Sequence, residues 1–370
     1  MLSLGSNISA TQAVESKYSA SFDGTDDFID FGNVNNLGTG DFSFSFWVKA
    51  SDTASNFLIS KREDDANRWY IRTEGNSRAQ FFAKKSGSDI MTATSSSSGE
   101  LSANVWNHVV IACDRSDGST GLKFYINGSL ENSRPASTTD IDNTGDFYIG
   151  KFSTNFAKDG TILEEIGIFN VALDADAVTA IYNSGSPINL TFDKGNYDNS
   201  SDLQAYYRMG DGFFDDKANG VVHDQDNPGF GSDLVLAGDF SDASEWSVGT
   251  GWAIAGGKAT CTSGNSNLQQ NGTEGGGSTW IVAGKTYKII YTISDYTSGN
   301  LVIDIGGSSA YTDSSPTVGA NKIYLTTVNT NHLRFYGGAF RGSISNVTVH
   351  QLNGNPGLTS GGVTFSSDTP

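Results

Sequence analysis

The chain has few cysteines and no long apolar run. It holds two cysteines among 370 residues, Cys113 and Cys261. We place them in different domains and expect two buried free thiols rather than a disulfide, so folding needs no oxidising compartment. No stretch approaches the roughly 18 consecutive apolar residues of a membrane helix, so we expect no membrane insertion.

Positive charge is also scarce. There are 23 Lys and Arg against 41 Asp and Glu, which gives a formal net charge of −18. Such a chain repels phosphate backbones, so we expect no nucleic-acid partner. The acidity suits a cation site built from oxygen ligands, and it also keeps a crowded assembly soluble. Residues 1–7 lack the basic and apolar regions of a secretory signal, so we expect synthesis and folding in a cytoplasm.

The sequence motifs of common hydrolases are missing. There is no G-x-S-x-G, H-E-x-x-H or Walker loop. A glycoside hydrolase needs two carboxylates on one face of the site, whereas Glu164 and Glu165 are adjacent and would face opposite sides of a strand. We therefore expect no enzymatic activity. The four histidines are scattered, and we assign the first to core packing: His108, His223, His332 and His350.

Short strands separated by turns are abundant. The chain has 44 glycines and 37% hydrophobic residues. The segment 42–49 alternates, with Phe residues and Val48 on one face and mostly polar residues on the other, as in a half-buried antiparallel strand. Trp47 is the exception on the outer face. Asn127-Gly128 between two strand-like runs predicts a two-residue hairpin, because both turn residues need a positive φ.

A strand followed by a helix is predicted over residues 160–185. With a period of two, Glu164, Ile166 and Ile168 share the core-facing side of the strand. A buried carboxylate there needs a partner or a metal. Asp174 is the expected N-cap of the short helix that follows, and Gly185 is the expected stop.

Five segments resemble the laminin-G-like, concanavalin A-like jelly-roll family, in the family's order and roughly its spacing. They are residues 18–32 (with SFDGTDDFIDFG), 42–49 (FSFSFWVK), 106–113 (WNHVVIAC), 122–128 (LKFYING) and 160–182. The resemblance implies a calcium ion at the edge of the sandwich, with Asp23 and Glu164 as ligands. The alternative is that Asp23 caps its own turn and Glu164 pairs with a Lys or Arg.

A second resemblance covers residues 234–352. Its G-D-F, W, G-W and G-G pattern, beginning at Gly238, is similar to the first strands of carbohydrate-binding-module-like, galactose-binding-like sandwiches. We therefore predict an all-β chain of two antiparallel jelly-roll β-sandwiches in tandem, with one short helix near the end of the first. The predicted parts are an N-terminal arm (1–17), a first domain (18–232), a second domain (233–352) and a flexible tail (353–370).

Glycan binding needs an exposed aromatic plane beside polar groups on a concave surface. Aromatic residues of a β-sandwich more often belong to the core, and we assign Phe240 and Trp252 to it. The candidates for a sugar platform are Trp69, Tyr70, Trp246, Trp280 and Tyr336.

By analogy with proteins that combine such domains, we expect a non-enzymatic bacteriophage virion protein, either a capsid decoration or a tail fibre or adhesin. It would lie on the virion surface, bind host or environmental carbohydrate, and dock on capsid or tail proteins through its N-terminal arm. A homo-oligomer is compatible with this role. The alternatives are a secreted or surface bacterial lectin or adhesin and, less favoured, an accessory fragment of a glycoside hydrolase.

Overall fold

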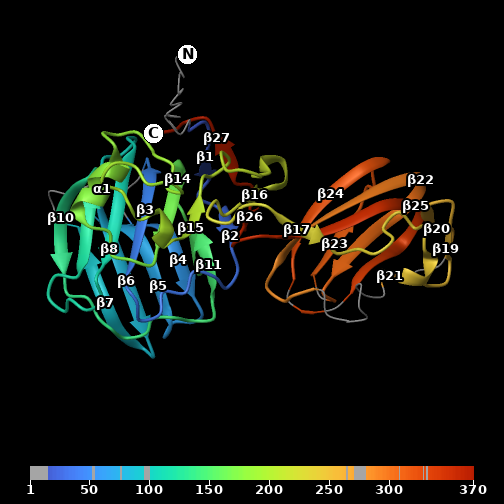
Figure 1. Ribbon diagram of the computed structural model, residues 1–370, viewed down its shortest axis with the longest axis horizontal. Helices are drawn as coiled ribbons and strands as arrows, with labels where there is room; N and C mark the ends of the chain where they lie inside the picture. Colours follow the sequence, from blue (N-terminus) through green and yellow to red (C-terminus); the bar gives the residue numbers. More distant parts are fainter. Residues whose placement is uncertain are drawn as a thin grey trace, which may run out of the picture. The chain divides into compact units, whose positions relative to one another are not determined.

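The computed structural model describes residues 16–51, 55–75, 77–95, 101–263, 266–270, 281–307, 309–327, 329–330 and 332–370. The chain divides into two compact units: the first comprises Met1–Pro228 and Gly357–Pro370, and the second comprises Gly229–Pro356. Both units are built from antiparallel sheets, and among the described residues there is a single α-helix, which confirms the predicted fold class (Figure 1). No helix among these residues is long and apolar enough to cross a membrane.

One sheet of the first unit is centred on the strand with the alternating phenylalanines. These rings face the core, while Ser43 and Ser45 point to the other side. In spatial order the strands are β10 (Ser129–Arg134), β9 (Leu122–Ile126), β8 (Asn107–Cys113), β3 (Phe42–Lys49), β14 (Thr161–Phe169), β1 (Ser19–Phe22) and β27 (Thr364–Ser366), and β15 (Leu203–Tyr207) also pairs with β14.

The opposing sheet has eight strands, and a small hairpin contacts it beside β4. In spatial order the strands are β16 (Val221–Val222), β26 (Gly357–Ser360), β2 (Phe28–Asp30), β11 (Asp146–Ile149), β4 (Asn56–Arg62), β5 (Arg68–Glu74), β6 (Arg78–Lys85) and β7 (Ser88–Thr94). The hairpin consists of β12 (Lys151–Phe152) and β13 (Asn155–Phe156).

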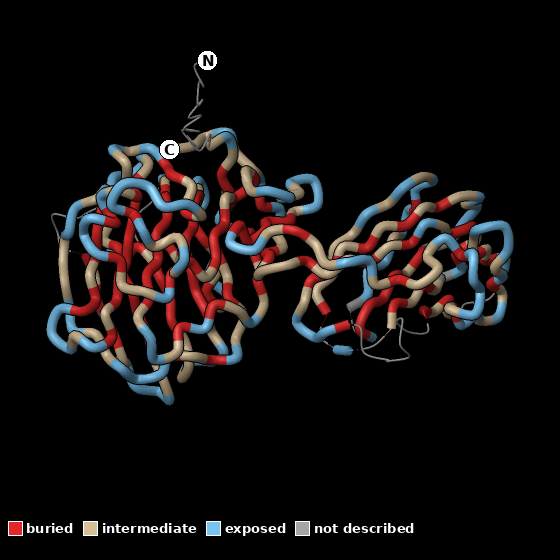
Figure 2. Tube along the Cα trace, in the orientation of Figure 1, coloured by how far each residue is buried: buried red, intermediate tan, exposed pale blue. Residues whose placement is uncertain are grey.

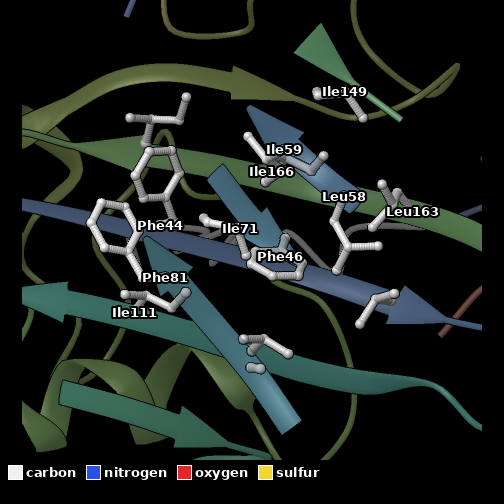
Figure 3. Close-up of a cluster of buried hydrophobic side chains, with 14 of the residues drawn as sticks. Phe44, Phe46, Leu58, Ile59, Ile71, Phe81, Ile111, Ile149, Leu163 and Ile166 are labelled. Carbon is white, nitrogen blue, oxygen red and sulfur yellow. The ribbon is translucent and has the colours of Figure 1, made fainter. Parts of the chain in front are cut away.

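The two sheets of the first unit enclose one hydrophobic core. Figure 3 shows Phe44, Phe46 and Ile166 from one sheet meeting Ile71 and Phe81 from the other, and all five are fully buried. Burying a side chain of this size stabilises the fold by about 1.5–3 kcal/mol. In Figure 2 the buried residues accordingly lie along the strands and the exposed residues lie in the connecting loops.

The predicted helix and hairpin lie next to each other. Helix α1 (Ala175–Tyr182) begins at Asp174, whose carboxylate accepts a hydrogen bond from the amide of Ala177 at 2.8 Å, and it ends at Asn183 in the left-handed region, two residues before the predicted Gly185. In the predicted hairpin Asn127 and Gly128 have φ values of 50° and 80°. A Cβ on Gly128 would lie 2.9 Å from the ring of Tyr182, so the helix packs where only glycine fits.

The second unit is organised around two long strands, β22 and β25, which pair with each other along most of their length. Among its described residues the strands are β17 (Phe230–Asp233), β18 (Trp246–Val248), β19 (Trp252–Ala255), β20 (Lys258–Cys261), β21 (Leu268–Gln270), β22 (Thr286–Ile305), β23 (Ser309–Asp313), β24 (Gly319–Thr326) and β25 (Leu333–Leu352). In the described part of the chain, short 3₁₀ turns cover Ser200–Asp202 and Lys217–Asn219 in the first unit and Ala243–Glu245 in the second. Both cysteines are buried and free, one in each unit, as predicted.

The C-terminal segment is part of the first unit. We predicted a flexible tail from residue 353, but β26 pairs with β2 and β16, and β27 pairs with β1. Val363 and Phe365 pack against the first core. These two apolar side chains hold a segment whose Gly- and Ser-rich composition predicts no contact with a core. The second unit is therefore inserted in the sequence of the first, between β16 and β26.

Candidate functional site

A β-bulge changes the predicted position of Glu164. The register of β14 against β3 runs from Glu164 opposite Trp47 to Gly167 opposite Ser45, so one extra residue is inserted in β14. Glu165, with a φ of 50°, lies in this bulge. Leu163 and Ile166 face the core, and Glu164 therefore lies on the opposite face. This corrects the prediction that Glu164 shares a face with Ile166 and Ile168.

Both glutamates are nevertheless buried. The side chain of Glu164 is fully buried; its Oε1 accepts a hydrogen bond from the Ser16 hydroxyl, and its Oε2 has no partner among the described residues. Burial, together with the nearby Glu165 and Asp211, raises the pKa of Glu164 to about 10. The sequence analysis considered a Lys or Arg partner for Glu164, but the ion pair is formed by the next residue: Arg208 Nε lies 3.0 Å from Glu165 Oε1.

Glu165 and Arg208 form a buried ion pair. Tyr206 donates a second hydrogen bond, from its hydroxyl to Glu165 Oε2. Burial still raises the pKa of Glu165 to about 7, although Arg208 acts in the opposite direction. The neighbouring Asp211 accepts hydrogen bonds from the amides of Lys17 and Tyr18, at 2.6 and 2.8 Å. Lys17 and Tyr18 follow Ser16, the first described residue; most of the predicted N-terminal arm, residues 1–15, lies outside the described residues.

Asp23 and Glu164 are not brought together. Ala20 pairs with Leu163, so Glu164 lies opposite Ser19, four residues from Asp23 along β1, which is about 13 Å at the usual rise of a strand. This separation corrects the predicted pairing of the two as ligands of one ion.

Asp23 instead lies in an acidic turn with Asp26 and Asp27. One carboxylate oxygen from each of these three residues lies within 4.8 Å of the other two. Asp23 Oδ1 accepts from the amide of Thr25 at 2.8 Å, which is the turn cap considered as an alternative. Asp27 is 2% exposed, its Oδ1 has no partner among the described residues, and burial raises its pKa. This donor set of carboxylate oxygens suits a hard cation such as calcium.

Two of the predicted sugar platforms are core residues. Trp69 is fully buried among Phe44, Phe81 and Phe147. Trp246 is 3% exposed, packs on Phe240, and donates its indole N–H to a backbone carbonyl. Neither indole presents a plane to solvent, which corrects both assignments.

The other predicted platforms have different positions. Trp280 lies outside the described residues. Tyr336 is half-buried on β25, opposite Val302 of β22. Tyr70 follows the buried Trp69 on β5 and therefore lies on the outer face of its sheet. It belongs to a cluster of four rings, the outer aromatic cluster, which consists of Phe57, Tyr70, Phe82 and Phe152.

Guanidinium groups cover the outer aromatic cluster. Tyr70 stacks on Phe82 with ring centroids 4.9 Å apart, and its own exposure is 9%. The Cζ atom of Arg72 lies 5.3 Å from the centroid of Tyr70, and that of Arg68 lies 5.8 Å from the centroid of Phe82. The rings are thus planes that carry cations rather than open planes.

A pocket that the sequence analysis missed lies in the segment between β14 and β17. Its cavity of about 280 Å³ is bordered by two exposed rings, Phe213 at 73% and Phe192 at 52% exposure. We call it the Phe213 pocket; its lining consists of Asn189, Thr191, Phe192, Arg208, Phe213, Gln225 and Pro228. The sequence signal was the pair Phe213-Phe214 inside a Gly- and Asp-rich segment. Such a segment does not form a strand, so nothing in it directs a phenylalanine into a core.

The loop that carries Phe213 is held by two side chains. Asp215 accepts hydrogen bonds from the amides of Gly210, Gly212 and His223, at 2.6 to 2.9 Å. Gln225 accepts from the Phe213 amide at 2.6 Å and donates to the Phe213 carbonyl at 3.2 Å. Burial raises the pKa of Asp215 to about 6. The exposed ring is therefore presented by a fixed main chain.

A known protein family matches part of the first unit. Residues 23–179 match the concanavalin A-like lectin/glucanases superfamily. A search of curated proteins found no match. Among solved structures, a putative carbohydrate-binding protein from Bacteroides ovatus has 16% identity and a TM-score of 0.41, with 57% of this chain and 56% of that chain covered.

Two further solved structures match less than half of this chain. A heptameric SAP-like pentraxin from Limulus polyphemus has 14% identity and a TM-score of 0.36, covering 45% of this chain and 82% of that chain. The CBM40 module of the Ruminococcus gnavus IT-sialidase, bound to α2,3-sialyllactose, has 12% identity and a TM-score of 0.33, covering 40% and 84%. Identities and TM-scores this low say nothing about a shared ligand.

The resemblance predicted for the second unit falls outside the matched residues and stays a prediction. For the first unit the match and the sheets agree. Residues 23–179 are similar to concanavalin A-like lectins and glucanases, and the antiparallel sandwich is the fold that this match implies.

Proposed function

We propose that this protein is a non-enzymatic carbohydrate-binding protein and that the Phe213 pocket receives the sugar. The observation that carries the proposal is the pair of exposed phenyl rings, Phe192 and Phe213, at the border of a cavity with amide, hydroxyl and guanidinium groups. The C–H face of a pyranose packs on such rings, and its hydroxyls need polar partners at the edge. Thr191 and Asn189 supply such groups.

The lining of the pocket favours binding over hydrolysis. It includes no Asp, Glu or His among the described residues, so it has no general acid or nucleophile for a glycosidic bond. Glu165 does not line the pocket. It accepts a hydrogen bond from Nε of Arg208, which does line it. We infer a lectin-like role for the first unit, which accords with the superfamily match.

Phe213→Ala is expected to weaken glycan binding about tenfold or more, because the pocket loses its most exposed ring. The ligand would first be found on a glycan array, and its affinity then measured by calorimetry. Phe214→Ala is the matched control, since Phe214 is 48% exposed but does not line the pocket. Equal losses in the two variants, or an array without any bound glycan, would contradict the proposal.

We also propose that the acidic turn holds a structural calcium ion through Asp23, Asp26 and Asp27, with further oxygen ligands from the main chain or water. Calcium is then expected to raise the melting temperature of the first unit by a few degrees, and Asp23→Asn should remove this increase. Asparagine keeps the oxygen that caps Thr25, so the variant separates capping from metal binding. A calcium-dependent shift that persists in Asp23→Asn would argue against this site; Asp64→Asn, in another turn, is the control.

For the biological setting, we propose the surface of a bacteriophage particle, with residues 1–17 docking on capsid or tail proteins. A secreted or surface bacterial lectin or adhesin accords equally well with the superfamily match. Mass spectrometry of purified particles and of culture supernatant separates the two settings. Recovery only from the supernatant would rule out the virion.

A further inference from the structure

The outer face of the second sheet in the first unit carries an unusual arrangement of cations. On β5, Arg68 and Arg72 flank Tyr70 on the same face, because they are two residues away on either side of it. On β6, Phe82 lies opposite Tyr70, and Gln80 lies opposite Arg72. Two guanidinium groups therefore lie on either side of a pair of stacked rings, although the chain as a whole is strongly acidic.

Carboxylates neutralise most of the neighbouring cations but not Arg72. Arg62 and Arg68 both pair with Asp65, at 3.0 and 2.7 Å. Arg78 pairs with Glu74 at 4.0 Å, and Lys84 pairs with Asp89 at 3.3 Å. Within the described part of the chain, no carboxylate lies within ion-pair distance of the Arg72 guanidinium.

The position of Arg72 is nevertheless fixed. Its Nε donates to Gln80 Oε1 at 2.6 Å, and Gln80 is 5% exposed. Its Cζ lies 5.5 Å from the centroid of Phe57 and 5.3 Å from that of Tyr70. This bond engages Nε alone. The two Nη groups have no hydrogen-bond acceptor among the described residues. Such a preorganised fork matches the two oxygens of a carboxylate.

We propose that this face binds an acidic saccharide, with the carboxylate of a uronic-acid-type sugar on Arg72 and the sugar ring beside Phe57, which lies opposite Arg72 on β4 and is only half-buried. A sugar is favoured as the carrier of the anion because the half-buried Phe57 ring lies directly next to the guanidinium. General attraction of polyanions does not account for such binding, because the formal net charge is −18. The site is separate from the Phe213 pocket and shares no lining residue with it.

The test uses the full-length protein and two probes that differ only in charge. Oligogalacturonate carries a carboxylate on every ring, and its full methyl ester has the same rings without charge. By calorimetry the acid is expected to bind about tenfold more tightly than the ester. In Arg72→Gln this ratio should fall to about one. Arg134→Gln makes the same charge change on β10 of the other sheet and should leave the ratio unchanged.

Two results would overturn the inference: a ratio near one in the unaltered protein, or a ratio that persists in Arg72→Gln. Should Arg72→Gln fail to fold, Arg72→Lys replaces it. Lysine keeps the charge and most of the stem but cannot form the fork, so the ratio must still fall severalfold. Phe213→Ala should leave the ratio intact, so failure here and failure of the Phe213 pocket are distinguishable.

Discussion

Deleting residues 357–370 is expected to abolish the cooperative unfolding of the first unit while the second unit keeps its own transition. The deletion removes β26 and β27, one from each sheet of the first sandwich. It also removes Val363 and Phe365 from the core, and Asp368, which binds Lys49 at 2.5 Å. Losing two strands costs several kcal/mol, which is comparable to the whole stability of a domain, about 5–15 kcal/mol.

Differential scanning calorimetry of the truncated and full-length chains checks this expectation. Asp368→Ala is the matched control, because it removes only contacts to Lys49 and to the Trp106 indole N–H. We expect it to cost about 1 kcal/mol at most, as for other solvent-exposed ion pairs. A truncated protein with two unchanged transitions would show that β26 and β27 do not stabilise the first unit.

Replacing Glu164 by Gln is expected to stabilise the first unit at neutral and alkaline pH and to have little effect near pH 4. Burial raises the pKa of Glu164 from 4.5 to about 10, so between these values the folded state holds a proton that the unfolded state has released. The stability of the unaltered protein therefore falls as the pH rises through this range. Glutamine is always neutral and avoids this loss, which is on the order of 3 kcal/mol at pH 7.

Urea unfolding at pH 4, 7 and 9 measures the difference between the two proteins. The charged neighbours of Glu164, namely Glu165, Asp211 and Arg208, are present in both, so their own titration largely cancels in the comparison. Glu165→Gln gives the contrasting case, because it leaves the Arg208 guanidinium without its buried partner and is expected to destabilise the protein. A stability gain for Glu164→Gln that does not change with pH would contradict the assigned pKa.

Local features of the fold could be predicted from the sequence. The alternation of faces in β3, the Asp174 cap and the Asn127-Gly128 turn depend on residues close together in the chain, and all three are confirmed. The half-burial predicted for β3 is wrong, because Ser43, Ser45 and Trp47 on its other face are buried as well. The burial of Cys113 and Cys261 is confirmed as well, because small apolar side chains in strands commonly face a core.

Features that depend on distant residues could not be predicted. The residues around Glu165 do not predict its left-handed conformation, yet this bulge determines which face of β14 carries Glu164. The period of two places Trp69 and Tyr70 on opposite faces of β5 but does not say which face is the core. The Phe213 pocket depends on hydrogen bonds that Asp215 and Gln225 accept from amides several positions away, and such contacts leave no periodic pattern.

The insertion of the second unit has a consequence for synthesis on the ribosome. The first unit cannot be completed until Gly229–Pro356 has been translated, because β26 and β27 come last. At about 5–20 residues per second this interval lasts roughly 6 to 26 s. Throughout it β1 and β2 lack their final neighbours, and unpaired strand edges of this kind recruit other chains. The speed of translation through the inserted unit therefore sets how long each nascent chain is exposed to aggregation.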